Sequence, residues 1–116
     1  MSASIVPHSS RPVYEVKANL FRVLGHPARV RILELLQSGE RSVGSLQSEL
    51  ELDSGGTSQH LSALRRIGVV QSRRDGTNVY YRVADERVFD LLQAGREIIT
   101  RQLAEQQSLL RELDQP

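Results

Sequence analysis

The sequence predicts a mainly α-helical fold with a small β-hairpin, arranged as a winged helix-turn-helix. Residues 42–67 have the pattern of two short amphipathic helices joined by a tight turn. An Asp75-Gly76 turn signal follows between two short runs of strand-forming residues, as in a β-hairpin. A helical pattern about eight turns long then occupies residues 85–113. With two helices before residue 42, these segments predict about five helices and a two-stranded wing.

The chain of 116 residues is long enough for one domain with one modest core. Residues 1–12 contain two prolines and four serines without a periodic pattern, so we expect a flexible N-terminal arm and a single domain over residues 13–116. No apolar run approaches the roughly 18 to 20 residues that cross a bilayer, and the N-terminus lacks the apolar segment of a secretory signal. A cytoplasmic protein without a membrane partner is therefore expected.

The residues that usually carry catalysis or hold metals are sparse. Cysteine is absent, which excludes disulfides, thiolate metal ligands and thiol-based sensing. The three histidines, His8, His26 and His60, fall in separate segments with no paired carboxylate and no metal-ligand spacing. No glycine-rich phosphate loop is present either. We therefore expect neither an enzyme nor a bound metal or cofactor.

The first two predicted helices are joined by a short boundary segment. Residues 13–24 are apolar largely on one helical side. Gly25-His26-Pro27 ends this helix and starts the next, because proline suits the first helical position, where its missing N–H removes no bond. The second helix is apolar over more than half of its circumference, which indicates the central core helix. Ser42 then offers an N-cap for the third helix.

The fourth helix, roughly residues 54–67, has one apolar and one polar side. Either Asp53 or Ser54 can cap its N-terminus. Leu61 and Leu64 face inward, and at about 100° per residue Gln59 lies almost opposite them. The polar side therefore faces solvent or a ligand.

Positive charge is concentrated on this helix and the hairpin. From Ser54 to Arg82 the chain has five arginines and one acidic residue, a balance of +4. From Val83 to the end it has four arginines and seven acidic residues, a balance of −3. A polyanion responds to such local charge density rather than to the net charge of +1. The pattern predicts one face for DNA and a separate face that does not bind DNA.

We predict a sequence-specific DNA-binding regulator of transcription. A helix of this kind fits the major groove, where Gln59 can read adenine through two hydrogen bonds and the arginines suit phosphates. His60 flanks the core side, which favours packing or orienting a phosphate over base reading or metal binding. The alternative is a winged helix that contacts only protein, with an incidental basic surface. The candidate DNA contacts are Ser54, Ser58, Gln59, Ser62, Arg65, Arg66, Arg73, Arg74, Thr77 and Asn78.

The last predicted helix carries an apolar face that approximates a heptad seam. So small a body cannot cover so long a face, and leaving it in water would expose a large apolar patch. A second copy of the chain, with the first helix packing alongside, is the economical cover. We therefore expect a homodimer with contacts at Val16, Leu20, Leu91, Leu92, Ile98, Ile99 and Leu103.

Several motifs resemble the ArsR/SmtB family of bacterial winged-helix repressors. One is Leu24-Gly25-His26-Pro27 and the residues after it; a second is a Ser-x-His-Leu core that is followed by a leucine, a basic pair and Gly-Val-Val. The third comprises Arg73-Arg74-Asp75-Gly76 and Tyr80-Tyr81 of the hairpin. The resemblance runs from about Val13 to Arg101 without obvious insertions.

This resemblance implies a homodimer built from the first and last helices. Such a dimer represses by binding an imperfect palindrome near a promoter, with its own promoter as one candidate, and releases it when an inducer binds. It also implies that Thr57, beside Ser58 and Gln59, lies where the family reads DNA.

The positions that hold metals in the family differ here. Metal sensors of the family often carry Cys-Val-Cys at the start of the third helix, where this chain has Ser42-Val43-Gly44. Others use the start and middle of the last helix, where the aligned residues are Asp85, Arg87, Ile98 and Arg101. Thiolates and neutral imidazoles are missing from both places. Any inducer is therefore expected to be something other than a thiophilic metal, such as an unidentified small molecule.

Overall fold

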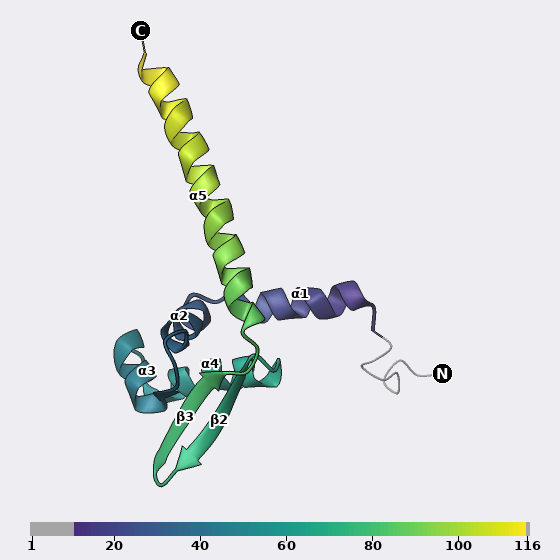
Figure 1. Ribbon diagram of the computed structural model, residues 1–116, viewed down its shortest axis with the longest axis vertical. Helices are drawn as coiled ribbons and strands as arrows, with labels where there is room; N and C mark the ends of the chain where they lie inside the picture. The colour runs from purple at the N-terminus through teal and green to yellow at the C-terminus, as the bar shows by residue number, and fades with distance from the viewer. Residues whose placement is uncertain (1–10, 116) are drawn as a thin grey trace. The chain divides into compact units, whose positions relative to one another are not determined.

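The computed structural model describes residues 11–115, and Figure 1 shows the helices and strands. The elements up to Ala84 form one compact unit, and the residues from Asp85 onward form a second. Most of the predicted arm, residues 1–10, lies outside the described residues. The single domain over residues 13–116 stays a prediction. In chain order the elements are α1 (Val13–Leu24), α2 (Pro27–Leu36), β1 (Arg41–Ser42), α3 (Val43–Leu50), α4 (Ser54–Arg66), β2 (Val70–Asp75), β3 (Asn78–Val83) and α5 (Arg87–Asp114).

The boundary between α1 and α2 lies where the sequence predicts it. Gly25 follows α1, and Pro27 is the first residue of α2. His26 caps α2, since its Nδ1 accepts a hydrogen bond of 3.1 Å from the backbone N–H of Ala28. This bond satisfies one of the N–H groups that the first helical turn leaves free. His26 therefore has a structural task at the junction.

Side-chain caps also fix the starts of α3 and α4. The Oγ of Ser42 accepts a hydrogen bond of 3.1 Å from the N–H of Ser45, which confirms the predicted cap. Asp53, rather than Ser54, caps α4, because its Oδ1 accepts a bond of 2.7 Å from the N–H of Gly56. The two caps fix the first turn of each helix of the helix-turn-helix, and Asp53 also lies in the turn between them.

The predicted hairpin forms, and a third short strand joins it. Strands β2 and β3 pair antiparallel, from Val70 opposite Val83 to Asp75 opposite Asn78. Gly76 in the turn has a φ of +63°, a conformation that glycine adopts without strain. Strand β1 pairs with the other edge of β3, so the sheet order is β1-β3-β2. The sequence did not predict β1, because two residues are too few for an alternating pattern.

The core of the first unit comes largely from α2, α3 and α4. The side chains of Ile32, Leu33, Leu46, Leu61 and Leu64 are all 0% exposed, which confirms the predicted inward side of α4. Burial of each such side chain contributes about 1.5–3 kcal/mol. Because one side of α4 is anchored in this core, its other side is held toward solvent in a fixed orientation.

The second unit is essentially the helix α5, which is 28 residues long. Val88 near its start is buried, but the apolar side chains further along are exposed, with Ile98 at 61% and Leu103 at 54%. The predicted apolar face is therefore present and uncovered. None of the helices in the described part of the chain has the length and apolar character that a membrane span requires.

Candidate nucleic-acid interface

The polar side of α4 presents most of its predicted contact residues to solvent. Ser58, Gln59, Arg65 and Arg66 are exposed, and Ser62 is half-buried. This arrangement follows from the helical period, because the leucines that anchor α4 lie on the opposite side. Ser54 is the first residue of α4. The exposed side chains are short and polar or carry a guanidinium, which suits contacts with base edges and phosphates.

Thr57 does not belong to this exposed side. Its side chain is 0% exposed, and its hydroxyl donates a hydrogen bond of 3.1 Å to the backbone carbonyl of Asp53. Thr57, Leu61 and Leu64 are spaced at i, i+4 and i+7, so all three face the core. The DNA contact that the sequence assigned to Thr57 is therefore not kept, and its side chain instead holds the first turn of α4.

A hollow of about 640 Å³ separates α4 from the hairpin. It brings together residues from distant parts of the chain, including Ser42 and the wing residue Tyr81. Arg65 spans the two elements, since its Nη1 donates a hydrogen bond of 3.4 Å to the Oγ of Ser72. Seven of the predicted DNA contacts line this hollow: Ser58, Ser62, Arg65, Arg73, Arg74, Thr77 and Asn78.

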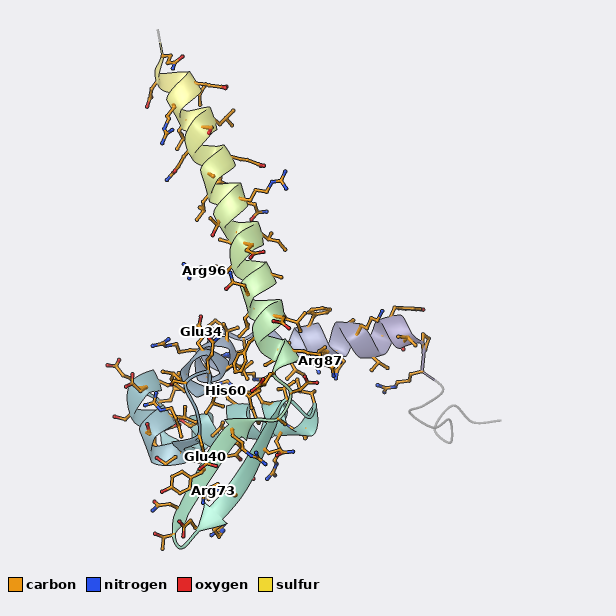
Figure 2. All side chains as sticks on the ribbon, in the orientation of Figure 1. Glu34, Glu40, His60, Arg73, Arg87 and Arg96 are labelled. Atoms are coloured by element: carbon orange, nitrogen blue, oxygen red, sulfur yellow. The ribbon has the colours of Figure 1, made fainter. Side chains whose placement is uncertain are left out.

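Arg73 is held by a carboxylate that the sequence did not indicate. Its guanidinium donates hydrogen bonds to both oxygens of Glu40, with Nε at 3.0 Å from Oε1 and 2.9 Å from Oε2 (Figure 2). It also lies over the ring of Tyr80, at 4.5 Å from the ring centroid, and 3.9 Å from an oxygen of Asp75. The bond from Arg73 lowers the pKa of Glu40, and the same pairing raises the pKa of Arg73. Arg73 is therefore neutralised by Glu40, whereas no ion pair of the described residues includes Arg74.

A second hollow, of about 530 Å³, lies on the exposed side of α4. It is lined by Arg29 of α2 together with Ser58, Gln59, Ser62, Arg65 and Arg66. Arg29 was not among the predicted contacts. No sequence signal pointed to Arg29, because a single arginine in the first turn of a core helix is most often a solvated charge.

His60 packs behind the exposed side of α4 rather than on it. Its Nδ1 accepts a hydrogen bond of 3.2 Å from the Nε of Arg29, and its ring centroid lies 4.3 Å from that of His26. Burial lowers the pKa of His60, and the nearby His26 and Arg29 lower it further. A neutral imidazole with an unprotonated Nδ1 is the form that can accept this bond. His60 thus packs beside His26 and orients Arg29, and the orienting of a phosphate by His60 stays a prediction.

At the start of α5, where metal sensors of the ArsR/SmtB family bind metal, the described residues form an ion pair rather than a set of metal ligands. Asp85 instead accepts a hydrogen bond of 2.6 Å from the Nη2 of Arg87 and one of 3.1 Å from its backbone N–H. These bonds lower the pKa of Asp85 to about 2. Among residues 11–115, no group of three or more histidine and acidic side chains is placed to hold a metal ion.

The residues predicted for a dimer contact lie on two helices, α1 and α5. On α1, Val16 is exposed and Leu20 is half-buried. On α5, Leu92 is half-buried and the others are exposed, from 40% for Leu91 to 61% for Ile98. Each helix therefore keeps an apolar face open to solvent.

The chain is similar to known bacterial regulatory proteins in both sequence and structure. The family model described as bacterial regulatory protein, arsR family, matches residues 26–72. The chain is 45% identical to the HTH-type transcriptional regulator Rv0081 of Mycobacterium tuberculosis over 90% of its own length and 92% of the relative. The crystal structure of Rv0081 aligns with a TM-score of 0.76 and 46% identity over 84% of this chain and 98% of that one.

Two further relatives carry more descriptive names. The biofilm growth-associated repressor of Xylella fastidiosa is 34% identical over 81% of this chain and 86% of the relative. The solution structure of the homodimeric winged helix-turn-helix DNA-binding domain Mb0332 of Mycobacterium bovis, described as a possible ArsR-family regulator, aligns with a TM-score of 0.72. It shares 28% identity with this chain, over 90% of this chain and 95% of that one.

Proposed function

Because the chain belongs to the ArsR family of bacterial regulatory proteins, we propose that it is a homodimeric repressor that binds an imperfect palindrome at a promoter. The chain is a DNA-binding transcriptional regulator with a winged helix-turn-helix, and its relatives are regulators rather than enzymes. Repression, the palindrome and the dimer of this chain belong to the proposal. The proposal places the protein in the cytoplasm, with the promoter of its own gene as the first candidate target.

The observation that supports DNA as the ligand is the charge of the two hollows beside α4. Both are lined by arginines and short polar side chains, and no acidic residue of the described chain lines either of them. A concave basic surface raises the local concentration of a polyanion. A protein partner would instead favour a centre depleted of charge, whereas most residues that line these hollows are polar or carry a guanidinium.

In this proposal α4 lies in the major groove and the hairpin follows the backbone. The exposed amide of Gln59 offers one donor group and one acceptor, which match the N7 and N6 of an adenine and would give sequence specificity. Arg65 and Arg66 lie further along α4 and serve phosphates, which fix position without reading sequence. Arg74, Thr77 and Asn78 extend these contacts along the wing.

Two uncovered apolar faces support the homodimer. The α5 helix is about 42 Å long and exposes seven large apolar side chains, Leu91, Ile98, Ile99, Leu103, Leu109, Leu110 and Leu113. On α1, Val13, Tyr14, Val16 and Phe21 are exposed by 52% or more. A two-fold dimer buries such faces against identical ones, and a two-fold dimer reads two inverted half-sites.

A mobility-shift assay with the DNA upstream of the gene, at two salt concentrations, tests the proposal. Gln59→Ala should reduce the preference for operator over random DNA, whereas Arg74→Ala should weaken binding to both by the same factor. Gln37→Ala, at an exposed glutamine just after α2, is the matched control for the first change. No shift at low salt would contradict DNA binding and would leave a protein-contact module as the function.

Light scattering after gel filtration tests the dimer. Leu103→Glu places a charge in the exposed apolar face and should yield a monomer that binds the operator weakly. Gln102→Glu adds the same charge at the neighbouring exposed position and should stay dimeric. A dimeric Leu103→Glu protein would show that this face of α5 is not the contact.

An inducer is a separate part of the proposal. Calorimetry against metal ions and small metabolites distinguishes a regulator with a ligand site from a repressor without one. Heat of binding that accompanies release of the operator would support an inducer.

A further inference from the structure

A third hollow, of about 340 Å³, lies among α1, α2 and α4. Three arginines from these three helices line it: Arg22 of α1, Arg29 of α2 and Arg66 of α4. Asn19 of α1 adds an amide, and no acidic residue of the described chain contributes to the lining. Three guanidinium groups at one hollow repel one another, so an anion between them would relieve that repulsion.

These arginines have no carboxylate partner within residues 11–115. None of the ion pairs of this part of the chain includes Arg22, Arg29 or Arg66. Elsewhere in the same unit, Arg31, Arg41 and Arg73 all pair with glutamates. The contrast marks the hollow as a place where positive charge is left available.

Two of the arginines are also held in position. Arg29 is half-buried, and it donates through Nη1 to the carbonyl oxygen of Val23 at 3.1 Å and through Nε to His60 at 3.2 Å. Its Nη2 makes no hydrogen bond to any described residue. Arg22 donates through Nη2 to the Oδ1 of Asn19 at 2.7 Å, which leaves its other nitrogens available. A guanidinium fixed in this way loses less side-chain entropy when it binds an oxyanion.

The hollow continues the exposed side of α4. Arg29 and Arg66 line this hollow and also the one that contains Ser58 and Gln59. A ligand that lies along α4 therefore passes directly to Arg22 and Asn19. A DNA backbone has this extended form, with a phosphate at every nucleotide, whereas a small anion would fill only one hollow.

We propose that Arg22, Arg29 and Arg66, with Asn19, bind one backbone phosphate of the DNA next to the bases that α4 reads. This inference rests on the proposed DNA-binding function and adds α1 and α2 to the contact surface. The bidentate geometry of a guanidinium matches the oxygens of a phosphate. The contact carries no sequence information, because every nucleotide offers the same phosphate.

Arg22→Ala tests the proposal with little risk to the fold, because Arg22 is exposed and alanine favours helices. Binding to operator and to random DNA should weaken by the same factor. This factor is about eightfold for each bound protomer at 0.1 M salt, or roughly 60-fold for a dimer, if the contact contributes nothing at 1 M. The slope of log K against log salt should become shallower by about 0.9 for each protomer on the duplex. Arg22→Lys should recover most of the slope, because a lysine also neutralises a phosphate.

Arg31→Ala is the matched control, since Arg31 is exposed on α2 and pairs with Glu34 at 3.5 Å. It removes the same charge from the same unit, but Arg31 does not line the hollow, so the slope should stay nearly unchanged. Gel filtration and circular dichroism of both variants separate a lost contact from a lost dimer or fold. If Arg22→Ala binds DNA as Arg31→Ala does, while the wild type still shifts DNA, the phosphate site is wrong and the proposed function stands.

Calorimetry of the DNA-free protein with inorganic phosphate and with pyrophosphate separates a DNA site from a site for a small anion. Tight binding that Arg22→Ala abolishes, together with an unchanged salt slope on DNA, would overturn the assignment to the backbone. No shift of the wild type by any DNA at low salt would overturn both this inference and the proposed function.

Discussion

Replacing Glu40 by glutamine should strengthen binding to DNA, because the change removes the carboxylate that neutralises Arg73. In the free protein the Arg73 guanidinium binds both oxygens of Glu40 and stacks on Tyr80. Arg73 must therefore exchange one anion for another before it contacts a phosphate. Glutamine keeps the size of the side chain and one acceptor oxygen, but it removes the charge.

The size of the effect follows from one added phosphate contact. Such a contact steepens the slope of log K against log salt by about 0.9 for each protomer. If the contact contributes nothing at 1 M salt, binding at 0.1 M becomes tighter by about eightfold for each protomer, or roughly 60-fold for a dimer on the duplex. The free energy of unfolding should change little, because the Arg73 side chain is 52% exposed and exposed ion pairs add little to stability.

Fluorescence anisotropy with a labelled operator duplex, at several salt concentrations, measures the affinity for DNA and the slope of log K against log salt. Glu34→Gln is the control, because Glu34 pairs with Arg31 on α2 and its loss adds the same net charge away from the wing. An equal gain in both variants would attribute the effect to net charge. An unchanged slope in Glu40→Gln would refute the reasoning, since Arg73 would then stay away from the phosphates even when released.

Three further predictions concern stability and are checked by urea unfolding. Leu61→Ala should lower the free energy of unfolding by about 2–5 kcal/mol, because it opens a cavity at a fully buried position. Asp53→Ala should cost about 1 kcal/mol, because it removes the cap of α4 at Gly56, and Asp53→Asn should recover most of the loss. The folded protein lowers the pKa of His60 below the usual 6.5, so the unfolded chain takes up a proton first as pH falls. The contribution of His60 to the free energy of unfolding should therefore be fully present above pH 6.5 and decline below it. His60→Gln should flatten this decline. An equal decline in His60→Gln would assign the pH dependence to other groups.

Most boundaries of the helices and of the hairpin could be predicted from short-range signals. The Gly25-His26-Pro27 boundary and the Ser42 cap each depend on residues within a few positions of one another. The same holds for the Asp75-Gly76 turn, whose backbone conformation only a few residue types adopt easily. Strand β1 could not be predicted in this way, because its two residues become a strand only through pairing with Tyr80 and Tyr81.

The candidate site was predicted less completely than the fold. The exposed side of α4 follows from the helical period, and Gln59 lies where that period puts it. The resemblance to the family placed Thr57 among the DNA contacts, but its side chain faces the core. Similar motifs do not determine which side chains of a helix are exposed. Arg29 was overlooked, since its position beside Gln59 comes from the packing of α2 against α4.

The sequence by itself determined the order of the helices, the hairpin, the basic face and the apolar face of the last helix. These features follow from periodicity, turn chemistry and local charge, which are properties of neighbouring residues. Only the tertiary structure decided that Glu40 holds Arg73, 33 residues away, and that Arg22, Arg29 and Arg66 meet at one hollow. The physical reason is that these contacts exist only after three helices and a strand pack on a common core. No local pattern records which charge on one element will face which charge on another.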